Sequence, residues 1–239
     1  KILSCDDNEN SNREEEDYED ITINLDEYKH HPSVIKIREF VSITETFNFS
    51  DVNTEDIKKV IKELNKKTTA VIDDIPAKIL IDSCEVTSSY LAKIYKKSKE
   101  MSLFPTSLKL ANVTPVHKKK ERTNKENYRP ISILPTVSKV FERNMHKEIF
   151  SYIEKHLSPF LFGFRKGHNT EACLIIMIEK WRNALDKKLK AGAILTDLSK
   201  AFDCLNHRLL IAKLDAYGFS KLSLKFIYSY LYNRKQRTK

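Results

Sequence analysis

Asp197 follows directly on a short apolar run and is the carboxylate best placed in this sequence for chemistry on a phosphate. The run, AGAILT at 191–196, predicts a short buried strand, and polar sequence begins at Asp197. A carboxylate at the C-terminal end of a strand faces a crevice, where its oxygens can bind a divalent cation. Such cations stabilise the attacking and leaving oxygens in phosphoryl transfer. The alternative is that Asp197 caps the next helix, and its position alone favours this cap.

Several amphipathic helices must position this carboxylate. Ile57, Val60, Ile61 and Leu64 recur at helical spacing, and Thr54 before them is a suitable N-cap. The same spacing predicts three further helices, each with an apolar face. The first, within 86–99, presents Tyr90, Leu91, Ile94 and Tyr95, and the second presents Val137, Val140, Phe141, Met145 and Ile149. The third follows a cap at Asn169 or Thr170 and presents Leu174, Ile178, Trp181 and Leu185. A last helix, over about 204–217, is expected to close at Gly218.

Strands are expected to be few. The segment NVTPV at 112–116 is β-prone, and Pro115 marks it as an edge strand or a strand end, because proline has no N–H to donate to a ladder. Only four glycines occur in 239 residues, which argues against a Gly-rich sandwich and a dinucleotide-binding loop. The sequence therefore predicts a helix-rich α+β fold.

The charge of the chain is unevenly distributed. Residues 1–30 hold 11 acidic and 3 basic side chains, and the remainder holds 39 basic and 22 acidic ones. Residues 1–29 are predicted to be an acidic disordered linker. The basic excess that follows can bind polyanions through phosphate neutralisation and counterion release. A solvated, lysine-rich surface explains the same charge equally well.

The cysteines and the hydropathy exclude several classes of protein. Cys5, Cys84, Cys173 and Cys204 form no CxxC pair and have no histidine at ligand spacing, which indicates neither a zinc site nor a disulfide framework. No apolar run reaches the roughly 20 residues of a membrane helix, and the first three residues are too short for a signal peptide. We therefore expect an intracellular protein in a reducing compartment, with no membrane partner.

Five segments in a fixed order carry a resemblance to a known family. They are AxVTPVxKK at 111–119, NYRPISILPTVSKVFE at 127–142, GFRKGHNT at 163–170, LTDLSKAFDCLNH at 195–207 and SYLYNRKQR at 229–237. Each segment alone is a modest signal, whereas five in this order with family-like gaps are specific. Over roughly residues 30–239, they resemble the reverse transcriptases of non-LTR (LINE-type, jockey-like) retrotransposons.

The resemblance implies a role for each residue around Asp197. Asp197 matches the first catalytic aspartate of the polymerase palm and, with the neighbouring Leu198 carbonyl, would bind catalytic Mg²⁺ or Mn²⁺. Phe202 matches the aromatic gate that leaves no room for a 2′-hydroxyl, and Ala201 would join it in the nucleotide site. Without the family context, Phe202 is equally well interpreted as a core residue on the first turn of a helix.

The resemblance also implies contacts to nucleotide and nucleic acid. Lys118 and Arg129 match the fingers cations that hold the triphosphate, the lysine as a point charge and the arginine as a planar fork. Either could instead be a surface charge, and the lysine run at 118–120 leaves the choice among its members open. The residues that resemble contacts to the template strand, or lead toward them, are Gly163, Phe164, Arg165, Thr170, Arg234 and Arg237. For 163–170, a simple turn followed by a cap is an equally good interpretation.

The resemblance divides the chain into the linker at 1–29, a helical lead-in at 30–100, and fingers with the first part of a right-hand palm at 101–239. The family's second catalytic element, an aromatic-Ala-Asp-Asp hairpin, would come after Lys239. We therefore expect a chain truncated before that motif and inactive by itself, because one carboxylate cannot hold two metals in transfer geometry. Val71 replaces a usual family glycine, so the turn there is expected to differ.

Two functions are compatible with these features. An RNA-directed DNA polymerase would add dNTPs to a DNA primer on an RNA template, namely the element's own RNA, with assembly in the cytoplasm and integration in the nucleus. The alternative is a non-catalytic relic that binds RNA or DNA through its basic body alone. Primer–template binding that falls steeply with salt would support the second function.

Overall fold

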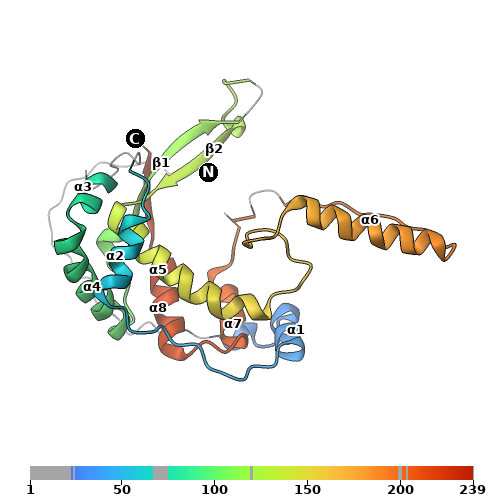
Figure 1. The fold of residues 1–239 in the computed structure, drawn as a ribbon, viewed down its shortest axis with the longest axis horizontal. Helices are drawn as coiled ribbons and strands as arrows, with labels where there is room; N and C mark the ends of the chain where they lie inside the picture. The colour runs from blue at the N-terminus through green and yellow to red at the C-terminus, as the bar shows by residue number, and fades with distance from the viewer. Residues whose placement is uncertain are drawn as a thin grey trace.

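The computed structural model describes residues 23, 25–66, 75–118, 121–198, 201–202 and 204–238. Its helices and strands are α1 (Pro32–Phe40), α2 (Thr54–Lys62), α3 (Ala77–Asp82), α4 (Cys84–Glu100), β1 (Leu110–His117), β2 (Tyr128–Ile133), α5 (Thr136–Ile153), α6 (Thr170–Asp186), α7 (His207–Ala216), α8 (Lys221–Leu231) and β3 (Lys235–Thr238). The mixture of helices with a small sheet confirms the predicted α+β class (Figure 1). The predicted turn at Val71 and nearly all of the predicted linker lie outside the described residues.

Helix α2 begins where its sequence supplies two reciprocal caps. The Asn53 side chain accepts a hydrogen bond from the Asp56 amide at 2.8 Å, and the Asp56 carboxylate accepts one from the Asn53 amide at 3.4 Å. The N-cap is therefore Asn53, one residue before the Thr54 that the sequence predicts. The predicted apolar stripe is confirmed, because all four of its residues are buried.

Aromatic side chains from α4, α5 and α8 form the centre of the core. Tyr95 and Phe141 are both 0% exposed, and their ring centroids lie 5.0 Å apart in an edge-to-face arrangement. Phe226 of α8 lies 6.2 Å from Tyr95, again edge to face. These rings join the three helices, so the stripe predicted over 137–149 is confirmed as the inner face of α5.

The predicted inner face of α4 is only half confirmed. Leu91 and Tyr95 are buried, whereas Tyr90 and Ile94 are 62% and 49% exposed. Helix α4 contacts α2, α3 and α8, and only the side that carries Leu91 and Tyr95 joins the core cluster. The four predicted residues therefore span more of the surface of α4 than the neighbouring helices cover.

An extended segment at 41–53 crosses the body and fixes the turn after α7. The Phe47 amide donates to the Gly218 carbonyl at 2.9 Å, and the Ser220 amide donates to the Phe47 carbonyl at 3.0 Å. Gly218 has φ +85°, and a Cβ there would lie 2.5 Å from Ile43 and 2.9 Å from the Tyr152 hydroxyl. Glycine is therefore required on both conformational and steric grounds. It closes α7 as predicted.

Helix α7 begins at His207, three residues later than the sequence predicts. The Asn206 side chain caps it by accepting from the Leu209 amide at 3.1 Å, and the Asn206 amide group also donates to the Tyr28 hydroxyl at 3.1 Å. Tyr28 and Leu25 pack against the small cluster that α1 and α7 share. The last residues of the predicted linker, 25–29, thus belong to the folded body.

The three-stranded sheet has the order β2-β1-β3. Strand β1 pairs antiparallel with β2 over 112–117 and parallel with β3 over 110–113. Beyond Val113, β1 therefore has a partner on one side only, and the edge position predicted from Pro115 is confirmed for that half of the strand. Strand β2 was not predicted, because its sequence YRPISI contains a proline and no clear alternation.

Two prolines face each other in this ladder without costing it a hydrogen bond. The Lys118 amide donates to the Asn127 carbonyl at 2.8 Å, and hydrogen-bonded pairs alternate along an antiparallel ladder. The pair Pro115↔Pro130 therefore falls at a non-hydrogen-bonded position, where backbone N–H groups point away from the partner. Neither missing N–H is needed there.

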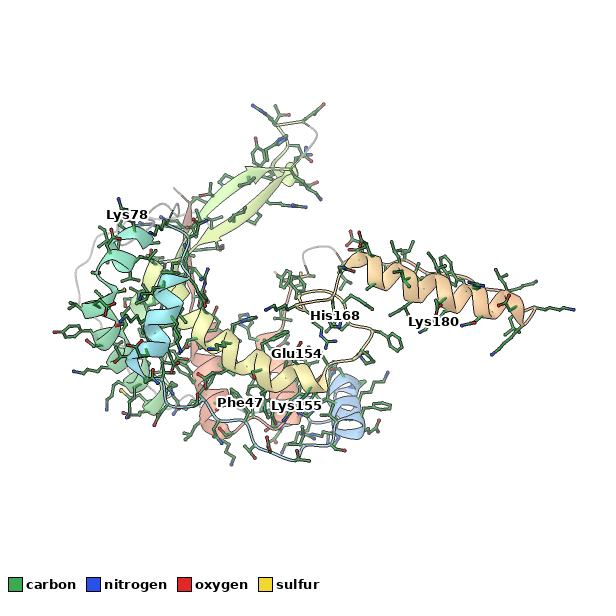
Figure 2. The ribbon with its side chains drawn as sticks, in the orientation of Figure 1. Phe47, Lys78, Glu154, Lys155, His168 and Lys180 are labelled. Carbon is green, nitrogen blue, oxygen red and sulfur yellow. The ribbon has the colours of Figure 1, made fainter. Side chains whose placement is uncertain are left out.

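Helix α6 extends away from the body, and we call residues 170–198 the arm (Figure 1). Asn169 caps the helix as predicted, accepting from the Ala172 amide at 2.8 Å. No residue of α6 is buried, and Leu174, Ile178 and Leu185 of the predicted apolar face are 47%, 56% and 65% exposed. Figure 2 shows Lys180 on the arm, away from Phe47 and Lys155 in the body. The predicted helix is confirmed, but among the described residues most of its apolar face is exposed, and Trp181 alone of the four predicted residues is half-buried.

Across the described part of the chain, we find no helix that is both long and apolar enough to cross a membrane.

Candidate functional site

The hairpin of β1 and β2 places Lys118 and Arg129 on one face. Arg129 pairs with Val116 in the ladder, and Lys118 lies two residues beyond Val116, opposite Asn127. Side chains two residues apart share a face of a strand, so the two cations are diagonal neighbours, with Cβ atoms about 7–8 Å apart in such pairs. Both residues are exposed. The structure therefore brings together two charges that are eleven positions apart in the sequence, and both side chains extend into solvent.

Asp197 lies in a segment that differs from its prediction. Residues 191–198 are neither helix nor strand and are exposed, with Ile194 and Leu195 at 94% and 92%. A strand is stable only when a neighbour accepts its backbone hydrogen bonds, and no described strand lies beside this segment. The prediction of a short buried strand is therefore wrong for this structure. Asp197 is exposed, and the next helix is capped by Asn206, so the capping alternative is wrong as well.

Phe202 and Phe164 connect the two loops that the sequence assigns to nucleotide and template. Their ring centroids lie 6.0 Å apart with the planes at 84°, an edge-to-face contact. Both are largely exposed, at 79% and 91%, so Phe202 is not a core residue. Phe164 has φ +61°, a left-handed backbone that is uncommon for an aromatic residue. Exposed rings on strained backbone are a feature of binding sites.

Arg165 shapes the loop that carries Phe164. Its guanidinium donates to the carbonyls of Ser158 and Leu161, at 3.1 and 3.4 Å, and so closes the loop on itself. Gly163 has open space around the position that a Cβ would take. Gly167 has φ +78°, so the turn requires glycine at that position. His168, labelled in Figure 2, packs edge to face on Phe162 at 5.6 Å. The loop is thus an organised turn before α6.

Arg234 and Arg237 both have partners within the chain. The Arg234 guanidinium lies 3.6 Å from the Glu142 carboxylate, and its centre lies 4.7 Å from the Tyr230 ring centroid. Arg237 donates to the Asn112 side chain at 2.7 Å, which ties β3 to β1. These contacts fix the turn from α8 into β3.

Glu142 is the centre of a small half-buried polar group that the sequence did not predict. Its carboxylate accepts from the Tyr230 hydroxyl at 3.0 Å and from the Ser138 hydroxyl at 3.4 Å. Burial raises the pKa of the Glu142 carboxyl above its ordinary value, although the Tyr230 hydrogen bond and the Arg234 charge oppose this. The available signal was an acidic residue next to Phe141 on the apolar stripe of α5.

A divalent cation would find oxygen donors at Asp197 and at the Leu198 carbonyl. Mg²⁺ prefers oxygen ligands and commonly uses one or two carboxylates together with water and substrate phosphates, so these donors fit it. Over the described ranges, no three His, Cys, Asp or Glu side chains gather into a metal-binding group. Asp197 therefore supplies one carboxylate, and a two-cation site needs carboxylates in addition to the described ones.

The predicted site residues thus fall into two groups in space. The triphosphate cations lie on the hairpin, while Asp197, Leu198, Ala201 and Phe202 lie on and just after the arm, where the Phe202 ring contacts the Phe164 ring. Thr170, exposed at the first turn of α6, belongs to the second group. Of the described site candidates, the triphosphate cations and Arg237 are the ones that the sheet positions.

Comparison with known proteins identifies the family. The family model described as reverse transcriptase (RNA-dependent DNA polymerase) matches residues 116–239, which is more than half of the chain. The chain is 32% identical over 165 residues to the probable RNA-directed DNA polymerase from transposon BS of Drosophila melanogaster, covering 68% of this chain and 18% of that protein. It is 29% identical over 170 residues to the RNA-directed DNA polymerase from mobile element jockey of the same organism, covering 69% and 18%.

A third relative is the probable RNA-directed DNA polymerase from transposon X-element of Drosophila melanogaster, at 35% identity over 121 residues, or 49% of this chain and 13% of that protein. The chain spans less than a fifth of the length of these relatives. The matched region contains the hairpin tip, the arm and β3. The chain belongs to the reverse transcriptase (RNA-dependent DNA polymerase) family, a family of nucleotidyltransferases, and its relatives include RNA-directed DNA polymerases of transposon BS and of the mobile element jockey.

Proposed function

We propose that this chain forms the fingers and the first part of the palm of an RNA-directed DNA polymerase, in which Lys118 and Arg129 bind the triphosphate of an incoming deoxynucleotide. The observation that carries the proposal is the register of β1 and β2, which puts both cations on one exposed face. An ammonium and a planar guanidinium fork complement phosphate oxygens. Such donors offset the charge that develops on a transferred phosphoryl group.

Asp197, with the Leu198 carbonyl, would hold magnesium or manganese at the reacting end of the nucleotide. When bound, the cation stabilises the attacking and leaving oxygens. Phe202 and Ala201 would line the sugar, and the Phe202 ring would exclude a 2′-hydroxyl. The edge of Phe164 against that ring supports this role, because a second ring limits the movement of the first.

The remaining predicted residues would serve an RNA template and a DNA primer in two different ways. Phe164 and Thr170 are exposed and suit direct contact with the template strand, beside the open surface at Gly163. Arg165, Arg234 and Arg237 have partners within the chain, which favours a role in holding the loop and β3 in place. The template would be the RNA of a mobile element, met in the cytoplasm and used in the nucleus.

Binding of dATP to the 239-residue chain in the presence of Mg²⁺ tests the proposal. Removing one charge-assisted phosphate contact costs about 1.5–3 kcal/mol, so Lys118→Ala and Arg129→Ala should each weaken binding by roughly ten- to a hundredfold. Asp197→Asn should remove the dependence on Mg²⁺. The control is Lys93→Ala, which deletes an exposed cation on α4 and should leave the affinity unchanged.

Two results would contradict this assignment. One is an Arg129→Ala variant that binds dATP as well as the parent chain does. The other is a loss in Lys93→Ala equal to that in Lys118→Ala, because it would reveal a general charge effect.

The lone carboxylate among the described metal-ligand candidates supports a second function, nucleic-acid binding without catalysis. In that case dATP would not bind to the parent chain, while primer–template duplex would bind with an affinity that falls steeply as salt rises. Binding of dATP and of duplex by the parent chain therefore separates the two functions.

A further inference from the structure

The β1–β2 hairpin has two chemically different faces. Successive ladder pairs alternate between faces, so Val116↔Arg129 belongs to the face of the triphosphate cations. The pairs Pro115↔Pro130 and His117↔Tyr128 belong to the opposite face. We call these last four residues the ring face.

The rings of the ring face are held in a defined arrangement. His117 and Tyr128 face each other at a non-hydrogen-bonded position, where cross-strand side chains lie closest. Their ring centroids are 5.3 Å apart with the planes at 62°. The Tyr128 hydroxyl donates to the Arg122 carbonyl at 2.9 Å, which fixes the ring against the loop at the hairpin tip.

The ring face is not part of the hydrophobic core. Neither of the two core clusters formed by described residues includes Tyr128 or His117. Both residues are half-buried, and Pro115 and Pro130 beside them are exposed. Strand β3 ends its pairing at Val113, so it does not extend along this part of β1. Figure 1 shows the hairpin projecting from the helical body. Two rings and two prolines are thus presented at the end of a projection.

The charge around the ring face identifies the kind of ligand that it fits. The tip sequence HKKKERTNKENYR at 117–129 contains six Lys or Arg residues and two Glu residues. Two of these cations, Lys118 and Arg129, stand on the opposite face, whereas Arg122 and Lys125 are exposed in the loop that the Tyr128 hydroxyl contacts. Rings flanked by cations bind single-stranded nucleic acid, because bases stack on the rings while the cations neutralise phosphates. A double helix keeps its bases stacked inside, so it presents no base faces to a side chain of this kind.

We propose that the ring face binds a single-stranded polynucleotide by stacking bases on Tyr128 and His117, on the side of the hairpin opposite the triphosphate cations. The proposal rests on the proposed function only in that the strand would be the template. The two faces would then read two different ligands, one by charge alone and the other by base stacking.

The test compares strands with and without bases. Fluorescence anisotropy would measure binding of the 239-residue chain to a labelled 12-nucleotide adenine strand, as RNA and as DNA, and to an abasic DNA 12-mer of equal charge. The parent chain should prefer both adenine strands over the abasic one by roughly five- to a hundredfold, the range that one stacked base gives. A stronger effect with RNA would indicate additional contacts to the 2′-hydroxyl.

Three variants separate the contribution of the Tyr128 ring to binding from the contributions of charge and of loop shape. Tyr128→Ala should weaken adenine-strand binding at least about fivefold, leave abasic binding and the salt dependence unchanged, and so reduce the base preference. Tyr128→Phe keeps the ring and loses the bond to Arg122, and should retain most of the preference. Ile131→Ala, an exposed change on the other face of β2, should behave as the parent chain does.

Three results would overturn the proposal: equal affinity of the parent chain for adenine and abasic strands, equal losses from both strands in Tyr128→Ala, or a loss in Tyr128→Phe as large as in Tyr128→Ala. Circular dichroism and the thermal midpoint of each variant would show that the fold is kept. Failure here is distinguishable from failure of the proposed function. A base preference without any dATP binding would remove the triphosphate assignment and leave the ring face in place.

Discussion

The body and the arm carry the same kind of apolar helical stripe, yet they bury it to very different degrees. Phe141 on α5 is 0% exposed and contacts the rings of Tyr95 and Phe104, whereas Ile178 on α6 is 56% exposed. Both stripes have helical spacing, and both helices form where the sequence predicts them. The difference shows that periodicity determines the helix, while burial depends on whether another element is available to pack against it.

The same contrast divides the candidate site. Lys118 and Arg129 stand on a ladder whose register is fixed by backbone hydrogen bonds to the body's sheet. Asp197 stands on a segment that no described strand pairs with. The chain thus holds its triphosphate cations in a defined geometry, but the carboxylate that would complete the chemistry has no such support.

The largest expected difference between the body and the arm is in the free energy of unfolding that an alanine substitution removes. Phe141→Ala should lower the free energy of unfolding by about 3–5 kcal/mol, because it opens a cavity between α4 and α5. Ile178→Ala removes a side chain that is already exposed and should change the free energy of unfolding by less than about 0.5 kcal/mol. Urea denaturation followed by circular dichroism measures both. Equal losses would mean that α6 is packed in solution.

Alanine substitutions at two glycines test the same contrast between a packed turn and an open one. Gly218→Ala forces a Cβ against Ile43 in a backbone with φ +85°, and should destabilise the chain by about 1–3 kcal/mol. Gly163→Ala meets open space and should stay within about 0.5 kcal/mol of the parent chain. The thermal midpoints of the two variants provide the comparison. A neutral Gly218→Ala would contradict the crossing of the 41–53 segment over this turn.

Ion pairs of different burial give a smaller and graded effect. In the Arg234–Glu142 pair the side chains are 24% and 22% exposed, whereas in the Arg38–Asp215 pair they are 45% and 43% exposed. Arg234→Ala leaves a half-buried carboxylate with fewer partners and should cost about 1–3 kcal/mol. Arg38→Ala should cost about 0–1 kcal/mol. Chemical denaturation at low salt measures both losses. A larger loss in Arg38→Ala than in Arg234→Ala would contradict the prediction.

The smallest predicted effect is a dependence on pH that Glu142 introduces. Its folded pKa is raised above the ordinary 4.5 by burial, so its contribution to folding is fully present below that value and is lost as pH rises through the folded pKa. Glu142→Gln does not titrate. The stability of the parent chain minus that of the variant should therefore fall as the pH rises above 4.5. A difference that rises with pH would show that the Arg234 charge outweighs the burial.

The elements that could be predicted from sequence are those whose signal is local. The Ile57 stripe, the Asn169 cap and the glycine after α7 all depend on residues within one or two turns of each other, and all three are confirmed. Strand β2 and the inner side of α4 depend on partners elsewhere in the chain. They were missed or only half predicted for that reason.

The candidate site was predictable in its residue types but not in its geometry. Segment order and residue identity pointed to Lys118, Arg129 and Asp197. The shared face of the two cations follows from a register that only the structure shows. The expected strand before Asp197 was inferred from apolar composition, which cannot indicate whether a pairing partner is present. The Glu142 group was missed because its members come from α5, from α8 and from the turn after α8, which are distant from α5 in sequence.

Hydrogen exchange of backbone amides in the 239-residue chain tests most directly the claim that one half of the site is held in a sheet and the other is not. The account predicts strong protection at Val113 in β1, which has a strand on each side. It predicts exchange near the unfolded rate at Ile194 and Leu195, which are exposed and outside any strand or helix. Protection of Ile194 and Leu195 comparable to that of Val113 would contradict the account, because it would show that the segment before Asp197 is already paired.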